Sequence, residues 1–169
     1  MIQFLLFVLF IGLAGLAIGT LTTVKVWYPL PLFLMILGAG CFLLFWFGVL
    51  IGGTIFSWVP LFFTKIFIIL FCLGLAVFFF RQYHPSHGYF PFQGFIHWIL
   101  LGLFFFIIGI DFAIIGFSAW LLLFLLPFFA GTVFLGSMLM WKLKRNYRFN
   151  ILTYAPLFIF FFLAVFKLL

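Results

Sequence analysis

Residues 94–116 read GFIHWILLGLFFFIIGIDFAIIG, an apolar run interrupted by a single charged side chain, Asp111. A helix of this length spans the hydrocarbon core of a bilayer, which is about 30 Å thick. Its apolar residues are continuous rather than alternating, which argues against a strand of a membrane barrel. Similar runs precede and follow it. The sequence therefore predicts an all-α, polytopic transmembrane helix bundle with about six spanning helices and no soluble domain.

The composition indicates the same fold class. Of the 169 residues, 70% are hydrophobic and 5% are charged, whereas a soluble domain is about half apolar and about a quarter charged. A soluble fold of this size exposes its outer layer to water and has no means of hiding so much apolar surface. No linker-like segment divides the chain, so we expect one membrane-embedded domain over residues 1–169.

Prolines, glycines and charged residues separate the apolar runs. The expected helices are 2–21, 30–52, 57–80, 94–116, 118–140 and 150–168. The break at Gly116-Phe117-Ser118 is the shortest, and without it the fourth and fifth helices would merge and leave five. No repeat of fixed period is evident, although the first three helices could form an inverted repeat with the last three.

Six spans place alternate loops on opposite sides of the membrane. One side receives Lys25, Arg81 and the basic segment 141–150, and the other receives Lys65, Lys167 and the α-amino group. Basic loops are typically cytoplasmic. We therefore expect the first side to face the cytoplasm or an organellar matrix, with both termini outside, in a bacterial plasma membrane or an organellar inner membrane.

Cations of the basic segment are candidates for contacts with anionic lipid headgroups, each worth about 1 kcal/mol near the surface. They are Lys142, Lys144, Arg145 and Arg148. The alternative is that they only set the orientation of the chain. A net charge of +7 would suggest nucleic acid in a soluble protein, but these loops are too short for that. The expected partners are membrane lipids, other membrane subunits or further copies of the chain.

Asp111 is the only acidic residue of the chain. A carboxylate at the centre of a spanning helix costs about 2.5–3.5 kcal/mol on insertion scales, so such a residue usually serves a purpose. Lys65 falls at a similar depth in the preceding helix, which predicts that Lys65 and Asp111 pair. The pair would form an ion or proton site near the outer mouth of a pathway, or it would only fix helix packing.

His84, His87 and His97 cluster near the inner interface. Imidazole is a common metal ligand, which makes the three histidines a weak metal candidate and an alternative contact for a quinone or a lipid headgroup. Pro85 makes the segment a turn rather than a helix that would present two histidines on one face. No cysteine or carboxylate lies nearby in the sequence, and no cofactor is indicated.

Two pairs of glycines have the spacing of close helix contacts. Gly15 and Gly19 lie four residues apart in the first helix, and Gly48 and Gly52 do so in the second. Small residues at this interval let helix backbones approach closely. The contact would be made within the chain or with a partner.

Three function classes follow, in this order. The first is a non-catalytic integral membrane subunit of a larger respiratory, transport or secretion complex. The second is a small oligomeric transporter or channel that uses Asp111 and Lys65. The third is a membrane-embedded enzyme that handles a lipid or a quinone near the histidines. A single acid excludes paired-carboxylate and two-metal chemistry, and the absence of a nucleotide-binding P-loop sequence excludes nucleotide hydrolysis by the chain alone.

Overall fold

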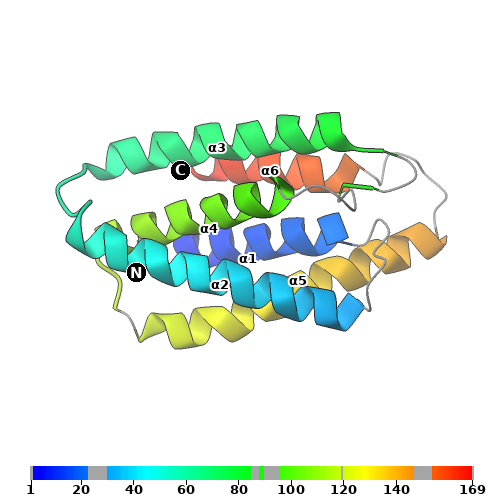
Figure 1. The fold of residues 1–169 in the computed structure, drawn as a ribbon, viewed down its shortest axis with the longest axis horizontal. Coiled ribbons are helices and arrows are strands. Elements are labelled where there is room, and N and C mark those ends of the chain that lie inside the picture. Colours follow the sequence, from blue (N-terminus) through cyan, green and yellow to red (C-terminus); the bar gives the residue numbers. More distant parts are fainter. Residues whose placement is uncertain are drawn as a thin grey trace.

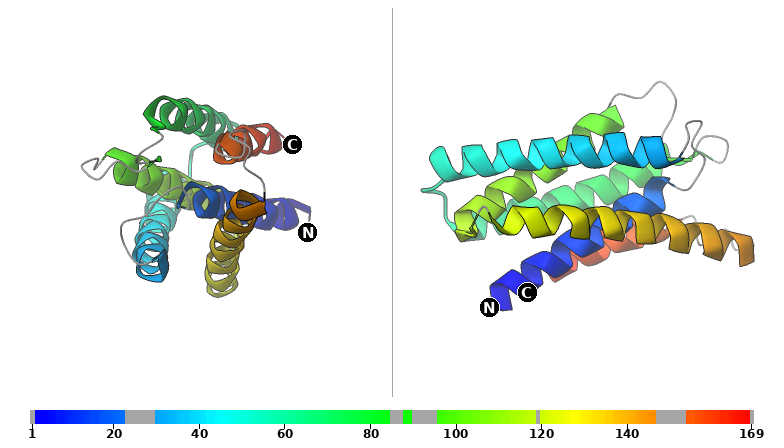
Figure 2. Two further views of the ribbon diagram at one scale, coloured as in Figure 1. Left: turned by 90° about the vertical axis from the view of Figure 1, so that its right-hand side faces the viewer. Right: turned by 90° about the horizontal axis from the view of Figure 1, so that it is seen from below.

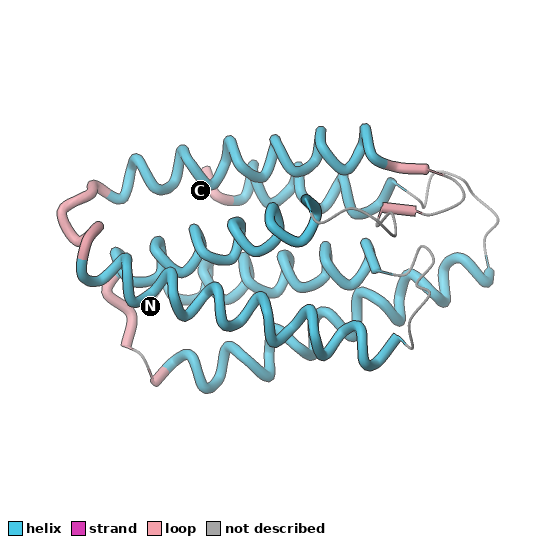
Figure 3. Tube along the Cα trace, viewed as in Figure 1, coloured by secondary structure: helices cyan, strands magenta, loops and turns pink. Residues whose placement is uncertain are grey.

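The computed structural model describes residues 2–22, 30–84, 88–89, 96–118, 120–146 and 154–168. These residues form six α-helices, and within them the only bridge between extended residues joins His84 to Gly88 (Figure 3). The helices are α1 (Ile2–Thr22), α2 (Leu30–Thr54), α3 (Leu61–Gln82), α4 (Ile96–Ile115), α5 (Leu121–Asn146) and α6 (Ala155–Phe166). The chain is an all-α polytopic membrane bundle, as the sequence predicts.

Five of these helices, α1 to α5, are long and apolar enough to cross a bilayer. The sixth, α6, has 12 residues and rises about 18 Å, so it is shorter than the expected helix over 150–168, whose first residues fall outside the described part. Pro156 sits in the first turn of α6, where its missing N–H breaks no helical hydrogen bond. Helix α5 is longer than expected and ends at Asn146, because the Lys, Leu and Arg residues after residue 140 are good helix formers.

The short break between the fourth and fifth helices is confirmed. Helix α4 ends at Ile115, and Gly116 follows with a left-handed backbone conformation, at a φ of 80°. Glycine adopts this conformation without the steric cost that a Cβ imposes, and it commonly follows the end of a helix. Two separate helices therefore replace the single kinked element that was the alternative.

Consecutive helices run in opposite directions along the bundle (Figure 1). The start of α1, the end of α6 and the α2–α3 and α4–α5 connections lie toward one end, which we call the terminal end. The ends of α3 and α5, which carry Arg81 and Lys142, lie at the other, which we call the basic end. The C-terminus of α6 stops short of the limit that the α2–α3 connection marks (Figure 1).

The pattern of neighbouring helices has an internal symmetry. Helix α1 packs on α5 and α6, helix α4 packs on α2 and α3, and α3 and α2 also contact α6 and α5 respectively. Exchanging α1 with α4, α2 with α5 and α3 with α6 leaves this set of neighbours unchanged (Figure 2). Because α1 and α4 run in opposite directions (Figure 1), the two halves of the chain form an inverted repeat.

Matching contacts at the two closest helix crossings support this repeat. A Cβ built on Gly19 of α1 would meet the carbonyl of Val133 and lie next to Gly136 of α5. A Cβ built on Gly109 of α4 would meet the carbonyl of Phe45 and lie next to Gly48 of α2. In both crossings the facing glycine stands three residues after the carbonyl. The two crossings are therefore built alike.

One short sequence match accompanies the inverted repeat that the sequence left possible. The tetrapeptide Leu-Ala-Val-Phe occurs at residues 75–78, in α3, and again at residues 163–166, in α6. Phe79 directly follows the first copy and Lys167 directly follows the second, so these two residues occupy equivalent positions. Aligning Gly19 with Gly109 likewise makes Phe7 equivalent to His97 and Leu21 equivalent to Asp111.

All four glycines predicted to pack helices face another helix of this chain. Gly15 and Gly19 lie against α5, and Gly48 and Gly52 lie against α4. All four are buried. A methyl group at Gly19 or Gly48 would collide with a backbone carbonyl oxygen of the facing helix, so these crossings require a residue without a Cβ.

Candidate functional site

Asp111 lies in the last turn but one of α4 and is completely buried. Its Oδ2 accepts a hydrogen bond from the Lys167 ammonium, with Nζ 2.6 Å away, and the two form an ion pair. Its Oδ1 accepts a hydrogen bond from the Thr64 hydroxyl at 3.2 Å. Helices α3, α4 and the residue after α6 therefore each supply one polar group to a site within the apolar bundle.

The predicted partner of Asp111 is wrong, because its ion pair is with Lys167 and not with Lys65. Successive residues of an α-helix point about 100° apart, and in α3 it is Thr64 that points at the carboxylate. The sequence places Lys167 at the outer end of the expected helix 150–168, on the side that also receives Lys65. Since α6 ends at Phe166 and stops short of the terminal end, Lys167 instead lies at the depth of Asp111 and its side chain is only 10% exposed.

Two aromatic rings lie near the Lys167 ammonium. Nζ lies 6.0 Å from the centroid of the Phe7 ring and 5.2 Å from that of Phe10, within the range of a cation–π interaction. Cys72 of α3 is close enough to interact electrostatically with the lysine. The ring of Phe112, the residue after Asp111, packs on Phe7 with ring centroids 5.3 Å apart.

A cavity of about 420 Å³ opens beside the ion pair. Lys65 and Lys167 both line it, together with the amide side chain of Gln3. The remaining lining residues are apolar and come from α1, α3, α4 and the end of α6: Leu6, Phe7, Phe10, Leu61, Phe62, Ile115 and Phe166. Lys65 is thus part of the site, although it does not pair with Asp111.

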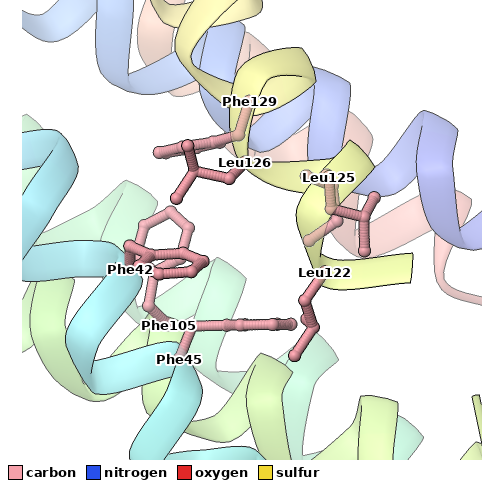
Figure 4. A pocket seen from close by; sticks show the side chains of 8 residues that line it. Phe42, Phe45, Phe105, Leu122, Leu125, Leu126 and Phe129 are labelled. Carbon is pink, nitrogen blue, oxygen red and sulfur yellow. The ribbon is translucent and has the colours of Figure 1, made fainter. Parts of the chain in front are cut away.

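A second cavity lies between α2 and α5 and has no polar group in its lining. Figure 4 shows Phe42 and Phe45 facing Leu122, Leu125, Leu126 and Phe129, with Phe105 of α4 behind them. Its volume is about 30 Å³, which is room for about one water molecule. Without a hydrogen-bonding partner a water would gain nothing there, so this cavity is a packing gap and not a chemical site.

At the basic end, aromatic side chains fill the space equivalent to the ion pair. Phe79 takes the position of Lys167 and is fully buried, and its ring lies 6.1 Å from His97, which takes the position of Phe7. Phe79 also packs on Phe160 and on Tyr89. Burial raises the pKa of the Tyr89 phenol, and the nearby phenols of Tyr83 and Tyr154 raise it further. Among the described residues, these rings fill the interior between α3, α4 and α6 near this end.

The histidines are not brought together as a metal site among the described residues. His97 is buried against Phe78 and Phe79, whereas His84 is exposed and its backbone bridges to Gly88. His87 lies outside the described residues. No group of three metal-binding side chains occurs in the described part of the chain.

The cations proposed to contact lipid headgroups begin on α5. Lys142 is exposed on this helix. Lys144 and Arg145 belong to the last turn of α5, and Arg148 lies outside the described residues. The contact with headgroups stays a prediction.

Fold and site together define the chain as a polytopic helical membrane protein with an inverted repeat and a buried ion pair. A comparison with protein-family models, with curated proteins and with solved structures finds no match to it. Its function therefore has to be inferred from the site alone.

Proposed function

We propose that the protein is a small transporter that moves an ion or a small solute through the bundle past Asp111 and Lys167. The observation that carries the proposal is the buried Asp111–Lys167 ion pair at the edge of a cavity of about 420 Å³. Ionisable groups at membrane depth are costly and rare, and those that occur commonly mark substrate pathways or proton relays.

The inverted repeat supports this proposal. Transporters built from two inverted halves bind their substrate at the interface between the halves, and rocking of one half against the other exposes the site to each side in turn. Here Asp111 comes from the second half, Thr64 from the first and Lys167 from the second. The site thus joins the two halves.

The two ends of the bundle differ as alternating access requires. The terminal end has the polar cavity, and toward the basic end the described interior is filled by the buried side chains of Phe79, Tyr89 and His97. In this proposal the structure represents a state open at the terminal end. By the positive-inside rule that end faces away from the cytoplasm, and a second state would open the basic end and close the cavity.

No comparable feature of the described residues favours the subunit or the enzyme. A subunit would be recognised by a fixed set of partners that co-purify in mild detergent. An enzyme would need a nucleophile or a metal beside a base, and the described residues contain no group of three metal-binding side chains.

The test is transport by the purified protein in sealed liposomes. Currents and the pH of the lumen are recorded while gradients of salts are applied across the membrane. Wild-type protein should respond to at least one gradient, and Asp111→Asn and Lys167→Gln should abolish or alter that response. Arg81→Gln is the matched control, because Arg81 is an exposed cation at the opposite end. Folded wild-type protein that leaves the liposomes as tight as protein-free ones would refute the proposal.

A further inference from the structure

The charges around the cavity select one class of substrate. Two ammonium groups, Lys65 and Lys167, line it, and the only acid of the chain, Asp111, is already paired with one of them. A cation entering the cavity would meet two positive charges and only one carboxylate, whereas an anion would be attracted. The cavity itself therefore favours an anion.

The Asp111 carboxylate already occupies the position beside Lys167 that a bound anion would take. The Asp111 carboxylate occupies Lys167 at 2.6 Å, so a second anion binds this ammonium well only if Asp111 lets it go. Adding a proton to the carboxylate removes its charge and with it most of the attraction. Binding of a proton at Asp111 and of an anion at Lys167 would thus favour each other.

The hydrogen bonds of Thr64 suit both protonation states of Asp111. The Thr64 hydroxyl has one proton and two acceptors in range, the Leu61 carbonyl oxygen at 2.9 Å and Asp111 Oδ1 at 3.2 Å. When Asp111 is ionised, Thr64 can donate to it. When Asp111 is protonated at Oδ1, it can donate to the Thr64 oxygen while Thr64 donates to Leu61. A proton can therefore enter without leaving a buried polar group unsatisfied.

We infer that the transported species is a small anion, which binds between Lys167 and Lys65 and crosses together with a proton carried by Asp111. This inference rests on the proposed transport function. Asp111 does not itself line the cavity, so the proton enters past Lys167 as the ion pair opens and adds to Asp111 Oδ1, and the anion takes the place of the carboxylate. For a monovalent anion one positive and one negative charge move together, so transport is electroneutral.

Few other titratable groups face this pair. From α3 they are Lys65, across the cavity, and the Cys72 thiol, beside Lys167. From α1 the facing side chains are Gln3, Phe7 and Phe10, which do not titrate. Within the described residues, the proton is therefore assigned to Asp111.

The experiment uses the full chain in sealed liposomes that contain a pH-sensitive dye. Inward gradients of chloride, nitrate and phosphate are applied with an impermeant organic cation, and gradients of sodium, potassium and magnesium are applied with gluconate. An anion gradient should acidify the lumen of wild-type liposomes well above the rate in protein-free ones, with no net current for chloride or nitrate. The response should weaken as the external pH rises.

Variants separate the two parts of the inference. Asp111→Asn mimics the protonated acid, so it should still pass the anion but without acidifying the lumen, and the movement should now carry current. Lys167→Gln should lose anion transport, and Arg81→Gln should behave like the wild type. Thr64→Val keeps the volume of the side chain and should slow acidification. If Asp111→Asn does not fold, the electroneutrality and pH dependence of the wild type decide the matter.

Three results would overturn the inference. Lumen pH that responds to sodium, potassium or magnesium but to none of the anions would make the site a cation exchanger and leave the proposed transport function standing. Anion movement that carries current in the wild type would remove the proton from the mechanism. The failure of every gradient would end both the inference and the proposed function.

Discussion

Replacing Gly48 by alanine tests the helix crossings on which the inverted repeat depends. A Cβ at this position would collide with the carbonyl oxygen of Phe106 and lie 3.0 Å from its carbonyl carbon and 3.1 Å from the Cα of Gly109. These are backbone atoms of α4, so no rotation of a side chain relieves the contact. Helices α2 and α4 would have to separate along their whole crossing.

The magnitude follows from a comparison within the same helix. Forcing an extra methyl group into a packed contact typically costs about 1–3 kcal/mol. At Gly38, also in α2, a Cβ meets nothing within 4 Å, and alanine there should gain up to about 1 kcal/mol from its higher helix propensity. Because Gly48→Ala gains the same helix propensity, the two variants should differ by the cost of the contact alone, about 1–3 kcal/mol, which is about a 5- to 150-fold change in the unfolding equilibrium.

The repeat makes the same prediction for the other crossing. A Cβ at Gly136 of α5 would lie 2.6 Å from the Leu16 carbonyl oxygen and 3.0 Å from its Cα, whereas at Gly131 of the same helix it meets nothing within 4 Å. Gly136→Ala should therefore be destabilised relative to Gly131→Ala by a similar amount.

Unfolding of the detergent-solubilised variants by SDS, followed by tryptophan fluorescence, measures the free energies of unfolding. The reasoning is refuted if Gly48→Ala and Gly38→Ala unfold at the same SDS fraction. A large loss at Gly48 with none at Gly136 would show instead that only one of the crossings is close, and the equivalence of the two halves would fail.

Two further predictions concern accessibility and pH. Cys41 and Cys72 are 5% and 0% exposed, so a membrane-impermeant maleimide should leave folded protein unlabelled until SDS unfolds it. Because the native cysteines stay unlabelled, single cysteines can then be introduced as Trp58→Cys or Arg81→Cys. The maleimide should label these two variants from opposite sides of sealed vesicles. Labelling of both from the same side would contradict the antiparallel order of the helices. The pKa of Tyr89 is raised by burial, so folding stability should be fully present below the ordinary phenol pKa near 10 and fall above it; Tyr89→Phe should reduce that fall, and an unchanged alkaline loss would count against it.

The two residues of the buried ion pair have apolar equivalents in the first half of the chain. Asp111 and Lys167 have Leu21 and Phe79 as their equivalents in the other half, and both of these are buried and apolar. Two similar helix arrangements therefore carry a polar site toward the terminal end and a buried aromatic cluster toward the basic end.

The sequence alone determined the fold class and most of the helix positions. Long uncharged runs are stable only where hydrocarbon surrounds them, and in hydrocarbon the backbone must form its hydrogen bonds within each helix. Local chemistry also placed the break at Gly116, because that residue adopts a positive φ easily, and identified Gly15, Gly19, Gly48 and Gly52 as contact residues. These features depend on neighbours in the sequence or on the solvent, and both can be read without coordinates.

Only the tertiary structure decided which groups meet. The helices are apolar on every side, so no polar stripe indicates which face turns inward, and the rotation that points Thr64 rather than Lys65 at Asp111 has no signature in the sequence. The depth of Lys167 depends on where α6 ends against its neighbours. The repeated Leu-Ala-Val-Phe could have shown that Lys167 corresponds to a buried position, but the carboxylate that it meets lies on another helix, and the packing of α6 against α1 and α3 brings the two together.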